Sequence, residues 1–273
     1  MPYPKAIIWL GLTLLTIIWG FWQSYFATQK PIPAAFHVHA VSALLWVGLL
    51  MFQHWSIHGK RRAIHRAAGQ LSLGLFPFLL AGFAMIVNVS AKGYATGESE
   101  FMQVAGPSFG ISMVMAMAAY IVLFYSALKY RRNVRLHAGY MLATAIVLFE
   151  SPFSRVIPDY FPFLMFANRP YPVGVLDTIA LAMLISALFS FVVYWRVKKD
   201  GFPFLLVGVL LVIEAFLMGF GTSIEPVRQL FARYAELPEW LTVSTAFALG
   251  VATVWAGWTA PNRQGPSTQI QPA

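Results

Sequence analysis

Apolar residues form long runs along almost the whole chain, and short polar segments separate these runs. A helix needs about 20 apolar residues to cross the hydrocarbon core of a membrane. Eight runs satisfy this requirement: residues 6–26, 34–57, 65–91, 106–129, 136–157, 172–196, 203–222 and 240–259. A soluble chain would show amphipathic stripes instead. The pattern predicts an all-α, polytopic integral membrane protein with eight transmembrane helices in one domain, residues 1–260.

The polar segments alternate in charge. Every second connection is rich in basic residues. The connection after the second run contains Lys60, Arg61, Arg62 and Arg66, the one after the fourth Lys129, Arg131, Arg132 and Arg135, and the one after the sixth Arg196, Lys198 and Lys199. Cytoplasmic loops of membrane proteins carry such an excess of Lys and Arg. The alternation therefore predicts that both termini are cytoplasmic. It also accounts for the formal net charge of +9, so the charge indicates the lipid bilayer and no nucleic acid as partner.

Two segments outside the eight runs have a distinct composition. Residues 261–273 are polar and rich in Pro and Gln, which predicts a disordered tail. Residues 222–240 are amphipathic and predict a short helix on the outer surface, anchored by Trp240. The chain has no cysteine. That absence excludes disulfides, thiolate metal sites and cysteine nucleophiles.

Four predicted helices each carry one ionisable residue in the outer half of the membrane: His39, Glu150, Asp177 and Glu214. At 1.5 Å per residue, His39 and Asp177 lie roughly 7–8 Å inside their helix ends, and the two glutamates roughly 10–12 Å. Such residues are costly in a bilayer and usually face a shared interior. We expect one polar cavity that holds a transition metal through His39 and two carboxylates, or an ion or proton. The alternative is separate structural bonds, including pairs with Arg155 or Arg169.

The second predicted helix carries His39, Trp46 and Gln53 at intervals of seven residues. A step of seven drifts by only about 20° on a straight helix, so the three form one stripe. A packing seam between two helices explains this spacing as well as a functional stripe of polar residues does. His37 points to nearly the opposite side from His39, so these two histidines do not form a chelating pair.

The inner half contains four histidines: His54, His58, His65 and His137. A haem b would use His54, with His65 or His137 as its second ligand; the alternative is interfacial histidines among basic residues. The segments 60–78 and 131–149 align as a faint parallel repeat. The repeat predicts that His65 and His137 occupy equivalent places at the starts of their helices.

The motifs on these helices resemble an uncharacterised family of small bacterial multi-pass membrane proteins, known only as a domain of unknown function. The matching residues are His39, Trp46, Gln53, His65, Arg66, Gly69, Leu136, His137, Met141, Leu142, Ala143, Thr144 and Asp177. The resemblance covers roughly residues 34–210 and implies a bacterial inner (cytoplasmic) membrane location. Where members of that family often have His-Pro, this chain has Phe202-Pro203.

The sequence leaves three functional hypotheses open. One is a metal- or haem-binding protein with a redox or metal-assembly role. The second is a transporter that binds an ion, proton or small solute at the outer carboxylates. The third is a scaffold or assembly factor, which would contact other membrane protein subunits. No P-loop, nucleophile elbow, zinc-protease motif or dinucleotide fingerprint indicates an enzyme class.

Overall fold

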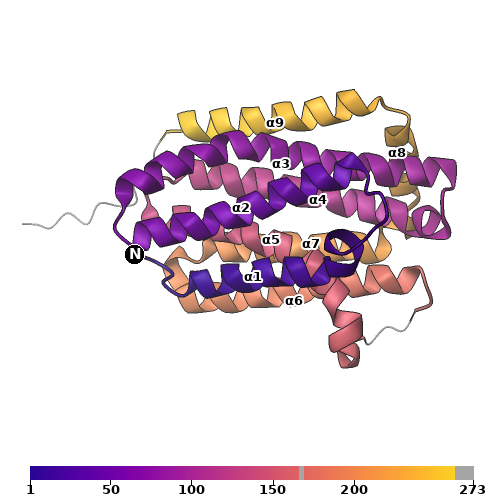
Figure 1. Ribbon diagram of the computed structural model, residues 1–273, viewed down its shortest axis with the longest axis horizontal. Coiled ribbons are helices and arrows are strands. Elements are labelled where there is room, and N and C mark those ends of the chain that lie inside the picture. Colours follow the sequence, from indigo (N-terminus) through magenta and orange to yellow (C-terminus); the bar gives the residue numbers. More distant parts are fainter. Residues whose placement is uncertain (166–168, 262–273) are drawn as a thin grey trace, which may run out of the picture.

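The computed structural model describes residues 1–165 and 169–261, which form helices and no strand (Figure 1). This confirms the all-α fold class. The α-helices are α1 (Ala6–Gly20), α2 (Ala34–His58), α3 (Arg62–Thr96), α4 (Glu100–Lys129), α5 (Val134–Tyr160), α6 (Val173–Val197), α7 (Phe202–Phe220), α8 (Glu225–Ala235) and α9 (Glu239–Thr259). All except α8 run along the long axis of the molecule.

Seven helices of the described chain, α2 to α7 and α9, are long and apolar enough to span a membrane. The first predicted span, residues 6–26, is divided. Its α-helix ends at Gly20, and Trp22–Phe26 forms a separate π-helical turn. A Cβ atom at Gly20 would lie 2.2 Å from the carbonyl oxygen of Pro152 on α5. The chain therefore turns where α1 touches α5, a contact that hydropathy does not reveal.

Helices α3 and α4 extend beyond the predicted spans 65–91 and 106–129. Helix α3 continues to Thr96 and ends at Gly97, which has a φ of 66°. The hydroxyl of Ser99 then accepts a hydrogen bond from the Met102 N–H at 3.2 Å and caps α4. Capping, not hydropathy, sets these two helix ends.

The amphipathic helix predicted within residues 222–240 is present as α8, which lies across one end of the bundle (Figure 1). Its buried residue Phe231 lies against Gly106 and Gly110 of α4. The predicted disordered tail, residues 261–273, falls outside the described residues except for Pro261.

The two ends of the bundle differ in charge. We call one the basic end; it carries the α2–α3, α4–α5 and α6–α7 connections with Lys60, Arg61, Arg131, Arg132, Lys198 and Lys199. The other, which we call the cavity end, carries the long connection of residues 21–33 between α1 and α2. The arrangement follows the alternation of charge in the sequence.

The centre of the bundle is closed by four aromatic residues, which we call the central aromatic cluster: Trp46, Phe76, Tyr120 and Phe124, each 0% exposed. The ring of Phe124 lies 5.2 Å from Trp46 and 4.3 Å from Phe76, measured between centroids. Two hydrogen bonds tie the cluster to Thr144 on α5. The Trp46 indole N–H donates to the Thr144 hydroxyl at 2.9 Å, and the Tyr120 hydroxyl donates to the Thr144 carbonyl at 2.7 Å.

Candidate functional site

A cavity of about 650 Å³ opens at the cavity end of the bundle. The 21–33 connection and helices α1 to α7 contribute to its walls. Most of the lining is apolar, and large side chains such as Phe36, Phe83, Phe109, Met113 and Met183 contribute to it. A cavity of roughly 300–1,000 Å³ with apolar walls and a few placed polar groups is typical of a small-molecule site.

Three of the four predicted outer residues line this cavity: His39 on α2, Glu150 on α5 and Glu214 on α7. The glutamates are 7% and 1% exposed. Nδ1 of His39 and Oε2 of each glutamate are buried without a hydrogen-bond partner among the described residues. The two carboxyl groups are near enough to interact electrostatically. Buried polar groups are rarely left unpaired, so each such group needs an explanation.

The fourth residue, Asp177, does not line the cavity. Its carboxylate forms an ion pair with Arg169, which lies just before α6. This is the structural alternative that the sequence also allowed. The depth of a residue below its helix end fixes its height in the membrane but not the direction of its side chain around the bundle. Asp177 lies near the start of α6, where Arg169 can reach it.

A proline and a cation shape the wall around Glu150. Pro152 has no N–H, so the Leu148 carbonyl lacks its helical donor at this point of α5. One turn further, Arg155 donates to the carbonyl and the hydroxyl of Ser151 at 2.8 and 3.1 Å. The Arg155 guanidinium also lies 4.3 Å from the ring centroid of Phe21 and interacts electrostatically with Glu150. Arg155 thus places a positive charge near Glu150, from an exposed position and without an ion pair between the two among the described residues.

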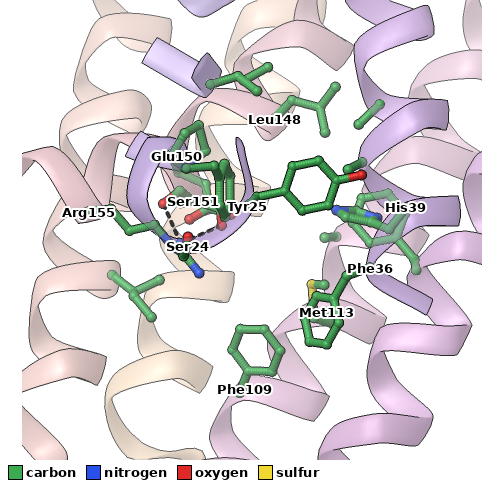
Figure 2. A pocket seen from close by; sticks show the side chains of 18 of the residues that line it. Ser24, Tyr25, Phe36, His39, Phe109, Met113, Leu148, Glu150, Ser151 and Arg155 are labelled. Atoms are coloured by element: carbon green, nitrogen blue, oxygen red, sulfur yellow. Dashed lines mark hydrogen bonds between the residues drawn. The ribbon is translucent and has the colours of Figure 1, made fainter. Parts of the chain in front are cut away.

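His39 faces Glu150 and Arg155 across the cavity (Figure 2). Its ring packs edge-on against Phe83, with centroids 4.7 Å apart. The glycine at position 82 allows α3 to approach α2 this closely, because a Cβ atom there would lie 3.0 Å from the His39 Cα. His37, as expected, serves another contact, and its Nδ1 lies 2.9 Å from the Tyr25 hydroxyl.

The described residues contain no group of three or more His, Cys, Asp or Glu side chains positioned to hold a metal ion. A first shell formed by His39 and two carboxylates is therefore not assembled in this arrangement. The transition-metal assignment for His39, Glu150, Asp177 and Glu214 stays a prediction.

The predicted haem ligands lie at the basic end. The Nε2 of His54 is 3.2 Å from the Tyr3 carbonyl, and its ring stacks on His58 at 3.9 Å. To bind iron through Nε2, His54 would have to give up this contact. Tyr3 also donates its hydroxyl to the Arg135 carbonyl at 3.4 Å. Burial raises the pKa of Tyr3 to about 12, so the hydroxyl keeps its proton at neutral pH.

His65 and His137 hold equivalent positions, three residues after the first residue of α3 and α5 respectively, which confirms the prediction from the repeat. Nδ1 of His137 donates to the Ala127 carbonyl at 2.9 Å, whereas Nδ1 of His65 is buried without a partner. Their assignment as haem b ligands, like that of His54, stays a prediction.

The sequence did not indicate that the 21–33 connection forms a wall of the cavity. Most residues between Gln23 and Pro33, among them Tyr25, Phe26 and Lys30, line it. The only sequence signal is the unusual mix of aromatic residues and prolines in a connection between two apolar runs.

Comparison of the whole chain with protein-family models, curated proteins and solved structures finds no match. The functional assignment therefore depends on the site itself.

Proposed function

We propose that this protein is a membrane carrier that binds a small ion or solute in the cavity, with Glu150 and Glu214 as its ion- or proton-binding groups. The observation that carries this proposal is the set of buried, unpartnered polar atoms of His39, Glu150 and Glu214 on one cavity. Ionisable groups inside a membrane bundle commonly mark ion pathways and proton relays. The apolar helical bundle fits a membrane protein, for which we propose eight spans, counting α1, in a bacterial inner membrane.

The arrangement of the closed and open regions supports a carrier with its cavity facing outward. The cavity is at the end opposite the basic connections, which the charge rule assigns to the cytoplasm. The four side chains of the central aromatic cluster are 0% exposed and do not line the cavity, and we infer that they separate it from the basic end. A scaffold that only locks helices together has no need of a cavity of about 650 Å³.

Accessibility of single cysteines tests the carrier proposal, and the chain has no cysteine of its own. Ala116 and Ala119 on α4 are 2% and 1% exposed, but only Ala116 lines the cavity. An impermeant, charged methanethiosulfonate reagent should modify Ala116→Cys in right-side-out vesicles and much less readily Ala119→Cys. In a carrier, the cavity also opens to the other side, so Ala116→Cys should react, more slowly, in inside-out vesicles.

The outcomes separate the hypotheses. Reaction of Ala116→Cys from the outer side alone would indicate a binding protein that does not alternate, and would refute the carrier. Equal reactivity of Ala116→Cys and Ala119→Cys would mean that the cavity is not the accessible site.

A metal or haem role is tested separately by the absorbance spectrum and elemental analysis of the purified protein. A Soret band lost in the His54→Ala, His65→Ala or His137→Ala variant would replace the carrier proposal with a redox function. Stoichiometric metal lost on replacement of His39 or Glu214 would point to metal handling instead.

A further inference from the structure

Glu214 lacks a counter-charge in the described structure. Its carboxylate accepts no hydrogen bond from a described residue, and Oε2 is buried. The Ser112 hydroxyl donates to the backbone carbonyl of Glu214 at 3.4 Å and leaves the side chain unpaired. An ionised carboxylate in such a place strongly destabilises the protein unless a cation offsets its charge.

The charged groups around the cavity do not supply that cation. From α5, Glu150 adds a second carboxyl group, and Arg155 donates to Ser151 and lies over the ring of Phe21. The 21–33 connection contributes Lys30, which is exposed at the rim. The remaining titratable groups are His39 on α2, Tyr25 in the connection, and Tyr120 on α4 beneath the cavity. Both cations on the cavity, Lys30 and Arg155, are exposed, so no buried cation among the described residues accompanies the buried carboxyl group of Glu214.

The walls favour an organic cation over a bare metal ion. A metal ion needs several polar ligands, and the described residues offer no such group of three. Aromatic faces attract organic cations and keep their apolar bodies away from water. Phe36, Phe83 and Phe109 line the cavity together with Met113 and Met183.

We propose that the cavity binds a small organic cation, a protonated amine or quaternary ammonium on an apolar body, with its positive charge at Glu214. This inference rests on the proposed function and names the ligand class for the same site. In the empty site, Glu214 carries a proton. On binding, that O–H bond breaks, the proton leaves to water, and the carboxylate pairs with the cation. The carrier would thereby exchange its ligand for a proton.

Two probes of the same shape and opposite charge test the ligand class. Tetraphenylphosphonium and tetraphenylborate are offered separately to the full chain in lipid nanodiscs, together with the smaller cation benzyltrimethylammonium. We expect at least one cation to bind saturably and tetraphenylborate not to compete. Glu214→Gln should weaken cation binding by roughly tenfold or more, because one member of a buried charge pair is lost. Glu236→Gln, which removes the same charge from an exposed position outside the cavity, should bind like the wild type.

The comparison of probes on the wild-type protein keeps the test decisive even where Glu214→Gln does not fold. Saturable binding of tetraphenylborate, or equal binding of both charges, overturns the organic-cation proposal but leaves the carrier intact. Binding of neither cation also overturns the proposal. The carrier proposal is tested separately, and it fails where Ala116→Cys is unreactive or reacts from one side alone. Cation binding that is unchanged in Glu214→Gln would show that the charge is held elsewhere, and would overturn the role of Glu214.

Discussion

The hydrogen bond from Trp46 to Thr144 should make a measurable contribution to stability, because it joins α2 to α5 between two side chains that are 0% exposed. Trp46 is 0% exposed, and its indole N–H donates to the Thr144 hydroxyl at 2.9 Å. Thr144→Val keeps the shape of the side chain and leaves this N–H unpaired, which costs about 1–3 kcal/mol. Trp46→Phe removes the donor and opens a small cavity. Truncation of a large aromatic residue to Ala costs about 3–5 kcal/mol, so this smaller change should cost about 2–3 kcal/mol.

A double-mutant cycle isolates the hydrogen bond from the packing change. Interhelical hydrogen bonds in a membrane protein average about 0.6 kcal/mol and reach about 1.7 kcal/mol, so we expect a coupling free energy in this range. The Thr144 hydroxyl also donates to the Met141 carbonyl at 2.6 Å, but that bond is lost equally in both legs of the cycle. Unfolding of the purified protein in mixed micelles with increasing dodecyl sulfate, followed by circular dichroism, gives the four free energies.

The matched control replaces Thr16 on α1, whose hydroxyl donates to the Leu12 carbonyl in an exposed hydrogen bond without a tryptophan partner. Thr16→Val combined with Trp46→Phe should be additive. Coupling between Trp46 and Thr144 within about 0.3 kcal/mol of zero, the usual limit of additivity, would show that the bond does not tie α2 to α5.

Two further predictions test the packing of α3 and the topology. Gly82→Ala should lower the free energy of unfolding by about 1 kcal/mol, since its Cβ would lie 3.0 Å from His39 and overpacking outweighs the gain in helix propensity. Gly74→Ala on the same helix, with nothing within 4 Å, should be neutral or stabilising; equal effects of the two substitutions would contradict the close approach at Gly82. Reporter fusions after residues 62, 132 and 198 should read cytoplasmic, and fusions after 100 and 232 periplasmic. A periplasmic reading at any of the first three positions would reject the proposed orientation.

The helices were predictable because their signal is local. The length of an apolar run and the charge of the following connection are both properties of neighbouring residues, so α2, α6 and α9 begin and end within one residue of the predicted spans. The short α1 was not predictable, because Gly20 ends it through contact with Pro152, more than 130 residues away in sequence. Local rules cannot detect such a contact.

The candidate site was predictable in part for the same reason. Residues at similar height can share a cavity, and His39, Glu150 and Glu214 do line the same one. Asp177 does not line it and pairs instead with Arg169, which lies beside it at the helix start. The direction of each side chain around the bundle decides between these outcomes. On α5, for example, Thr144 faces Trp46 while Glu150 faces the cavity.

The stripe of His39, Trp46 and Gln53 packs against one helix, α3, along its whole length. The surroundings of its centre and of its two ends differ. All three residues meet α3 in antiparallel order, with His39 at Gly82, Trp46 at Phe76 and Gln53 at Gly69. The stripe is therefore a packing seam between α2 and α3.

Its centre is apolar and closed, but its ends are polar. Nδ1 of His39 lacks a partner at the cavity, and both side-chain polar atoms of Gln53 lack one toward the basic end. A structural seam alone would be less costly with apolar residues at these ends, because buried polar atoms without partners reduce stability. In a carrier, the same groups have a use, since a solute released toward the basic end must meet polar atoms after it passes Trp46. The path would then open when Trp46 separates from Phe76. For this, α2 and α3 would move apart along the seam where Gly69 and Gly82 allow their close contact.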